Sequence, residues 1–168
     1  FYLLKKNVKI VSDNFTLSAD NVKINFDKSL YDISELNANG NVVFYSGIFN
    51  ITGNGNMLNF KIKIEELKIE GQGSELITKD IKMFSDGFIE VNNKNGNFTL
   101  EGQNSKLINE DLIIKAQFID GNFSDKEDIK DITFLNVLDE QMSYVKNNDT
   151  EMYAKKINFN NDSAIIEL

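Results

Sequence analysis

Apolar and polar residues alternate along most of this chain. The alternation is clear at 8–10, 15–17, 22–26 and 61–64, and it returns at 67–69, 81–83, 88–91, 98–100 and 157–159. Successive side chains of a β-strand point to opposite faces, so a period of two predicts half-buried strands with one apolar and one wet face. The pattern predicts an all-β chain with little or no helix.

Short clusters of asparagine, aspartate and glycine separate the predicted strands. They lie at 39–41, 53–56, 71–73, 86–87, 92–97 and 120–122. Asn-Gly and Asp-Gly supply the positive φ angles of hairpin turns, and the spacing of about 8–12 residues is typical of sandwiches and barrels. We therefore predict a meandering antiparallel sheet with hairpin turns at these clusters.

Two segments resist the alternation, at 65–67 and in the charged run 124–131. Neither keeps a helical stripe over the roughly 11 residues that a helix prediction needs. We expect the charged run to be a mobile loop or at most one helical turn.

A short unit recurs in the chain. The segments 24–26, 58–60 and 157–159 each read apolar-Asn-Phe and each precede a Glu-Leu pair. Asn25 and Asn59 are 34 positions apart, and Asn59 and Asn158 are 99 apart. A period of roughly 33 residues fits a stack of β-hairpins. The alternative is a chance match in an asparagine-rich chain.

The length of 168 residues and a hydrophobic content of 41% fit one globular domain, which we place at 7–168. Residues 1–6 are either the end of an N-terminal membrane anchor or part of a first strand. No stretch approaches the ~20 apolar residues that span a bilayer.

Composition argues against several classes of function. The net charge is -8 and the chain has no arginine, which disfavours binding to nucleic acid. It also has no cysteine and no histidine, which removes the usual zinc ligands, the thiol nucleophile and the commonest general base. Close carboxylates such as Glu65 and Glu66 fit solvated faces better than a catalytic pair. We expect no enzyme activity, no cofactor and no metal site.

Two segments carry a resemblance to a known family. The segment 17–27 reads LSADNVKINFD and is followed at 36–42 by LNANGNV, while 152–160 reads MYAKKINFN and is followed at 165–168 by IIEL. These segments resemble the OstA-like module of lipopolysaccharide-transport proteins of the LptA and LptC type. The region from about 61 to 131 matches only in its rhythm of strands and turns.

The resemblance implies a twisted antiparallel β-jelly roll, open along one side like a taco. It also implies a periplasmic protein of a Gram-negative cell, free or tethered to the inner membrane, that carries lipopolysaccharide toward the outer membrane. The implied partners are lipopolysaccharide acyl chains, other jelly-roll proteins of the same type, and an inner-membrane ABC transporter complex. Sequence alone does not separate an LptA-like bridge from an LptC-like adaptor.

Alternating apolar residues are the candidates for the lining of a lipid groove, and each fits an ordinary core position as well. The candidates are Phe15, Leu17, Ile24, Phe26, Val42, Phe44, Ile62, Ile64, Ile69, Ile81, Met83, Phe98, Leu100, Ile157 and Phe159.

The terminal segments are candidates for pairing with a neighbouring molecule, through Val8 and Ile10 at one end and Ile165 and Ile166 at the other. Edge strands present unpaired backbone groups that accept another strand. The alternative to a lipid carrier is a structural β-solenoid that serves surface adhesion or assembly. A solenoid would close around a dry core, whereas a carrier would leave a groove.

Overall fold

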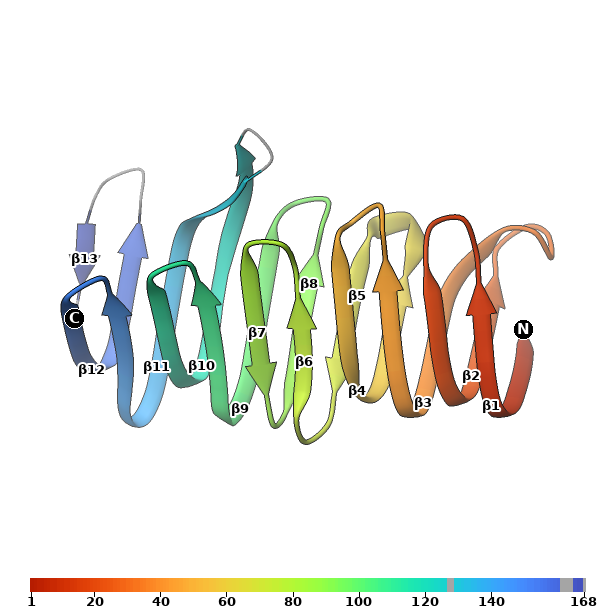
Figure 1. The fold of residues 1–168 in the computed structure, drawn as a ribbon, viewed down its shortest axis with the longest axis horizontal. Coiled ribbons are helices and arrows are strands. Elements are labelled where there is room, and N and C mark those ends of the chain that lie inside the picture. The colour runs from red at the N-terminus through yellow and green to blue at the C-terminus, as the bar shows by residue number, and fades with distance from the viewer. Residues whose placement is uncertain (127–128, 161–164, 168) are drawn as a thin grey trace.

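The computed structural model describes residues 1–126, 129–160 and 165–167, with side chains for 1–124 and 132–160. These residues form β-strands and one short 3-10 helix (Figure 1). The elements are β1 (Tyr2–Val11), β2 (Thr16–Phe26), β3 (Ile33–Ser46), β4 (Ile51–Lys61), η1 (Ile62–Ile64), β5 (Glu66–Glu70), β6 (Ser74–Ile77), β7 (Ile81–Ser85), β8 (Phe88–Asn92), β9 (Asn97–Asn109), β10 (Leu112–Lys126), β11 (Ile129–Asn147), β12 (Thr150–Asn160) and β13 (Ile165–Glu167). The prediction of an all-β chain is confirmed.

All strands belong to one antiparallel sheet in the order β1-β2-β3-β4-β5-β8-β9-β10-β11-β12-β13. The short strands β6 and β7 fill the remaining place, because β6 pairs with the first half of β4 and β7 pairs with the second half of β9. Most strands pair with their neighbours in sequence. The predicted meander is therefore correct, and the two ends of the chain lie at opposite ends of the molecule (Figure 1).

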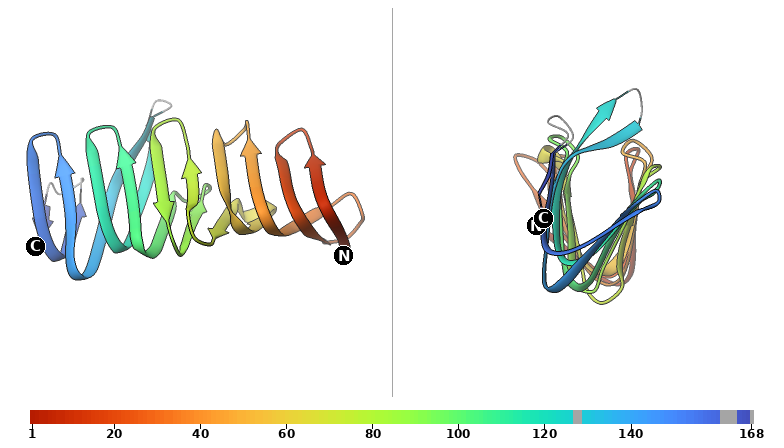
Figure 2. Two further views of the ribbon diagram at one scale, coloured as in Figure 1. Left: turned by 60° about the horizontal axis from the view of Figure 1, so that its bottom comes forward. Right: turned by 90° about the vertical axis from the view of Figure 1, so that its left-hand side faces the viewer.

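The sheet is folded lengthwise into two walls, which Figure 2 shows in the view along the long axis. We call the wall that contains β6 and β7 the front wall, as oriented in Figure 1, and the wall that contains β5 and β8 the back wall. Each long strand contributes one half to each wall. The line along which the strands bend is called the corner, and the chain reverses at the opposite rims of the walls. This architecture is the predicted antiparallel β-jelly roll.

Most of the glycine and asparagine clusters mark the corner and not hairpin turns. Gly40 and Asn41 lie inside β3, and register shifts interrupt the pairing of β3 with both neighbours there. The cluster 53–56 lies inside β4, and 71–73 and 86–87 connect front-wall to back-wall strands. Of the predicted turn clusters, 92–97 does connect two adjacent antiparallel strands at a rim, β8 and β9. The cluster 120–122 lies within β10. Gly40, Asn41, Gly71 and Gly73 have positive φ values, which a bend in a strand needs as well as a turn, whereas Gly53, Gly55 and Gly87 leave room for close neighbours, so both uses of glycine resemble a turn signal.

Small side chains occupy the inner side of the corner. Ala19, Ala38 and Ala116 are each 4% exposed and lie on the inner face beside the bends of β2, β3 and β10. A Cβ atom on Gly53 would come within 2.3 Å of Ile69 Cδ1 on the back wall. The walls approach each other too closely here for larger side chains.

Polar side chains close the outer side of the corner. Asn41 Nδ2 donates to Asp20 Oδ2 at 3.0 Å, and Asn104 Nδ2 donates to Asp86 Oδ2 at 2.8 Å. Asp139 Oδ2 accepts a hydrogen bond from a backbone N–H of β10 at 3.1 Å. Bends interrupt the ladder of backbone hydrogen bonds, so side chains from neighbouring strands must satisfy the groups that are released.

Two local predictions were wrong. The alternation at 61–64 ends with β4 at Lys61, and Ile62–Ile64 form η1, which is closed by Glu65 at a φ of 54°. The expected loop at 124–131 is a hairpin, because β10 continues to Lys126 and β11 begins at Ile129, with Ser124 paired to Asp131. Charged side chains at these positions do not prevent strand pairing, because the strands are paired by hydrogen bonds between backbone groups.

Candidate functional site

The inner faces of the two walls form one apolar interior along the long axis. Most of the sequence candidates for a groove lie in it and are buried: Phe15, Leu17, Ile24, Val42, Phe44, Ile69, Ile81, Met83, Phe98, Leu100 and Ile157. Phe26, Ile62 and Phe159 are partly buried and pack against this cluster. Ile64 is 45% exposed in η1 and lies outside it. The period-two pattern thus places nearly all of these side chains together.

Side chains fill the interior through its first half. The rings of Phe15 and Phe44 stack with centroids 6.0 Å apart, and Phe60 of the back wall meets them edge-on at 5.8 and 5.2 Å. Towards the middle, Leu76, Met83 and Ile89 are completely buried. In this region the two walls are joined by packed side chains.

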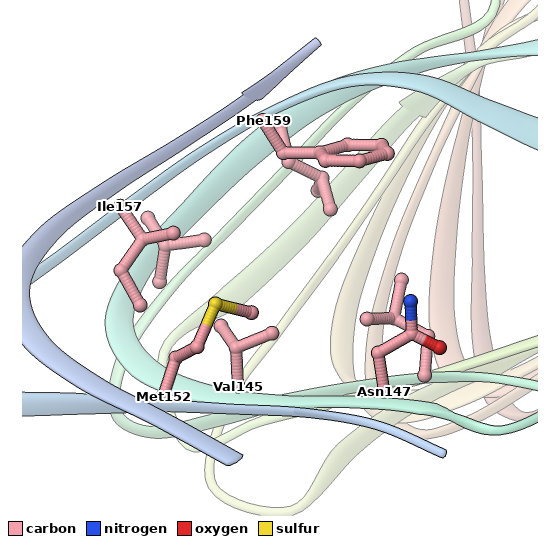
Figure 3. Close-up of a pocket in the computed structure, with 8 residues that line it drawn as sticks. Val145, Asn147, Met152, Ile157 and Phe159 are labelled. Atoms are coloured by element: carbon pink, nitrogen blue, oxygen red, sulfur yellow. The ribbon is translucent and has the colours of Figure 1, made fainter. Parts of the chain in front are cut away.

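An apolar pocket lies between the walls at the C-terminal end (Figure 3). Its open space is about 50 Å³, and its lining consists of Leu112, Leu135, Val137, Val145, Asn147, Met152, Ile157 and Phe159. Asn147 is the one polar side chain among these. The pocket is built by β10, β11 and β12, and β13, the last strand of the sheet, pairs with β12 beside Phe159.

Sequence reasoning had named only Ile157 and Phe159 of this lining. Asn136 separates Leu135 from Val137, but Phe134 and Leu138 beside them are also apolar, so the period-two signal in this part of β11 is weak.

The two end strands of the sheet differ in how much of their length is paired with the neighbouring strand. β1 lies at one end of the sheet order and pairs with β2 through 2–5 and 8–11. At the other end, β13 pairs with β12 only through 158–160. Val8 is buried and Ile10 partly buried on the inner face of β1, whereas the side chains of Ile165 and Ile166 lie outside the described residues. Residues 2–5, in the segment considered as the end of an anchor, form strand pairs with β2.

Carboxylates lie outside the apolar interior and are held by hydrogen bonds. Glu35 on the outer face of the back wall accepts from Asn59 Nδ2 at 2.5 Å and from Asn25 Nδ2 at 2.7 Å, and these bonds lower the pKa of Glu35. At the corner, burial opposes the charge of Asp86, but hydrogen bonds from the backbone and side chain of Asn104 outweigh it and lower the pKa of that carboxyl. In the described part of the chain, no group of three or more acidic side chains is placed to hold a metal ion.

These geometric features can be compared with known proteins. No family model and no curated protein matches the sequence. Among solved structures, the chain is similar to LptH, the LptA-homologous periplasmic component of the lipopolysaccharide transport device of Pseudomonas aeruginosa. The two share the fold. The match has a TM-score of 0.51 and 17% sequence identity, and it covers 71% of this chain and 81% of LptH.

The likeness to LptH agrees with the segments that suggested the OstA-like family. Ala19 and Asp20 of the first segment, and Ala38 and Gly40 of the second, are corner residues of β2 and β3. The motif is therefore the local signature of the fold's bend, where a small inner residue precedes a polar or glycine residue. Within the described residues, no helix is long and apolar enough to cross a membrane.

Proposed function

We propose that this chain is a periplasmic lipid-binding module of a lipopolysaccharide-transport bridge, and that acyl chains lie between its two walls. The observation that carries the proposal is the apolar pocket between the ends of β10, β11 and β12, inside a fold shared with LptH. Each methylene group moved from water into such a lining contributes about 0.8 kcal/mol, so several chains suffice to hold an insoluble lipid. Binding of this kind requires no catalytic group, metal or cofactor.

The size of the pocket defines how loading would proceed. A space of about 50 Å³ holds only a few water molecules or a short alkyl segment. An acyl chain would enter at the C-terminal end and advance only if the walls separate at their rims, away from the corner. The hydrogen bonds at the corner, such as those of Asp20 and Asp86, would keep the walls joined along that line.

The partners that fit this proposal are further β-jelly rolls that add to the end strands. β1 runs from the back wall to the front wall and β12 runs in the opposite direction. The front-wall half of β12, outside its pairs with β13, would therefore continue the antiparallel order if it were placed on the front-wall half of β1 of the next molecule. Val8 and Ile10 on one side, and Ile165 and Ile166 on the other, would lie near such a junction. Its place in the bridge, as an LptA-like element or as an LptC-like adaptor beside an inner-membrane ABC transporter complex, is part of the same proposal.

Photo-crosslinking to radiolabelled lipopolysaccharide tests the proposal. The inner position is Met152, which lines the pocket, and the matched control is its neighbour Tyr153, which points outward and is 58% exposed. A light-activated residue should crosslink lipid at 152 and at Phe159, and it should give little product at 153 or at Lys63. Equal crosslinking at 152 and 153 would contradict binding between the walls.

A structural role is the second candidate, and the filled first half of the interior favours it. Phe44, Leu76 and Met83 are at most 1% exposed, as expected for a solenoid with a dry core. The same experiment separates the two functions. A folded protein that gives no lipid product at any inner position would support assembly or adhesion as the role of this sheet.

A further inference from the structure

The outer surface of the corner contains a hollow that is separate from the pocket between the walls. It measures about 470 Å³ and lies where β9, β10 and β11 bend. Its lining consists of Gln103, Asn104, Ser105, Lys106, Lys115, Ala116, Asp139, Met142 and Tyr144. None of these residues contributes to the C-terminal pocket.

The front wall beside this hollow is basic although the chain as a whole is acidic. The front-wall segments 81–84, 105–109, 112–116 and 143–147 contain four lysines and no aspartate or glutamate, and the nearest carboxylate on the next strand, Glu151, accepts a hydrogen bond from the Tyr144 hydroxyl at 3.2 Å. Lys106 and Lys115 are directly opposite each other in the β9–β10 register. Side chains in such pairs have Cβ atoms about 5 Å apart, and like charges there destabilise the sheet.

The two ammonium groups lean away from each other. Lys106 Nζ lies 6.0 Å from the ring centroid of Phe84, and Lys115 Nζ lies 5.6 Å from that of Tyr144, so each cation rests over a ring on the strand beyond. The ion pairs found among the described residues involve other lysines, at 61, 63 and 68. An anion bound between Lys106 and Lys115 would supply the missing counter-charge.

The other polar groups of the hollow are hydrogen-bond acceptors, so a ligand that also donates hydrogen bonds would fit them. Asn104 uses its amide N–H on Asp86, which leaves its side-chain carbonyl as an acceptor. Asp139 Oδ1 accepts from the backbone of Gln141 and Met142, while Oδ2 accepts a single backbone N–H, from Gln117, and keeps room for another donor. Inorganic phosphate carries few donors, whereas a sugar carries several hydroxyl groups.

We propose that this hollow binds a phosphorylated saccharide, with the phosphate between Lys106 and Lys115 and sugar hydroxyls on the Asn104 carbonyl and on Asp139. The ligand is either free in solution or the headgroup of a glycolipid. Tyr144 forms one side of the site. The inference does not depend on lipid transport, because the hollow is on the outer surface and the proposed path of acyl chains is between the walls.

Amide chemical shifts of the 15N-labelled protein test the proposal at low ionic strength, with glucose 1-phosphate, glucose and inorganic phosphate as probes. Glucose 1-phosphate should shift the amides of 104, 106 and 115 and should bind more tightly than either other probe. The double variant Lys106→Gln, Lys115→Gln should weaken it by at least about tenfold, since each lysine contributes a charge-assisted hydrogen bond. The control variant Lys82→Gln, Lys146→Gln removes two lysines of the same wall that lie outside the hollow, and it should bind as the wild type does.

Vesicles distinguish the two sources of the ligand. Binding to phosphatidylcholine vesicles that contain lipid A, lost in the Lys106→Gln, Lys115→Gln variant, would identify a glycolipid headgroup. Chemical-shift changes with glucose 1-phosphate and no vesicle binding would identify a free ligand.

The proposal is overturned if inorganic phosphate binds as tightly as glucose 1-phosphate, or if the control variant loses binding equally. It is also overturned if phosphatidylglycerol vesicles bind as well as those with lipid A, or if no probe binds. Lipid crosslinking at Met152 reports on the interior and is unaffected by these outcomes.

Discussion

At the residue scale, alanine, glycine and aspartate define the corner that makes this sheet two-walled. Gly40 adopts a φ of +79°, and a Cβ atom there would lie 2.3 Å from Asp20 Oδ2 and 2.9 Å from Asp20 Cβ. Asp20 in turn accepts the hydrogen bond of Asn41 from the neighbouring strand. Position 40 therefore requires glycine both for its backbone conformation and for the close approach of Asp20.

Gly40→Ala should destabilise the protein by about 2 kcal/mol or more, because a left-handed φ disfavours a side chain and Asp20 must also move. Urea unfolding followed by circular dichroism measures the change in free energy of unfolding. Gly73→Ala is the matched control, since Gly73 has a φ of +75° but no atom within 4 Å of its Cβ direction. It should cost only about 1 kcal/mol, the steric cost of a left-handed φ for alanine. Equal losses in the two variants would show that the contact with Asp20 has no effect.

At the scale of elements, the outer face of the back wall is held by a ladder of polar side chains. Glu35 on β3 accepts from Asn25 on β2 and Asn59 on β4, and Asn59 also donates to Asn37 Oδ1 at 2.8 Å. Two of the recurring apolar-Asn-Phe units meet in this ladder. The asparagine of each unit faces outward, while its apolar neighbours face the interior, which gives the repeat a structural explanation.

The ladder predicts a pH dependence of stability that comes from Glu35. Its pKa is lowered in the folded state from an ordinary value of 4.5, first by the Asn59 hydrogen bond and then by that of Asn25. The stability that ionised Glu35 contributes to the folded state is therefore complete above its ordinary pKa. It is lost as the pH falls through the lower pKa of the folded state. Glu35→Gln should remove this part of the acid sensitivity.

Urea unfolding of wild type and Glu35→Gln at a series of pH values between neutral and about 3 checks this prediction, because the two stabilities should converge as the pH falls. Glu110→Gln removes a carboxylate from the exposed turn between β9 and β10 and controls for the loss of one charge. A difference between wild type and Glu35→Gln that stays constant over the whole series would contradict the assignment.

At the scale of the whole molecule, the two walls depend on side chains that reach across the interior. Phe44 of the front wall is 1% exposed and contacts Phe15 and, across the interior, Phe60 of the back wall. Its neighbour Tyr45 points outward and is 54% exposed. Substituting each of these two aromatic residues of one strand by alanine therefore distinguishes the effect of wall-to-wall packing from that of strand propensity.

Phe44→Ala should lower the free energy of unfolding by about 3–5 kcal/mol, because it removes a large buried ring and leaves a cavity between the walls. Tyr45→Ala should cost no more than about 1 kcal/mol, since only exposed surface and strand propensity change. Thermal and urea unfolding measure both. A similar loss in the two variants would indicate that the interior tolerates the cavity, as a space that opens for ligands would.

The period-two pattern was enough to predict the fold class, and most of the residues that it assigned to the interior are buried. Leu17, Ile24 and Phe98 were assigned to the interior from alternation alone, and all three are buried. The errors came where one residue type has two uses. Glycine and asparagine at 39–41 and 53–56 bend a strand in place and do not end it, and the charged run after Ser124 continues a hairpin.

The sequence by itself determined which residues of a strand share a face, because alternation is a local property of a strand. Only the tertiary structure decided where the sheet bends, how the register stacks the bends into one corner, and which apolar side chains fill the interior or line a pocket. These depend on residues far apart in the chain coming together, such as Gly53 beside Ile69, and Leu112 and Met152 in the lining of one pocket. The opposition of Lys106 and Lys115 is likewise a consequence of strand register, which no single segment specifies.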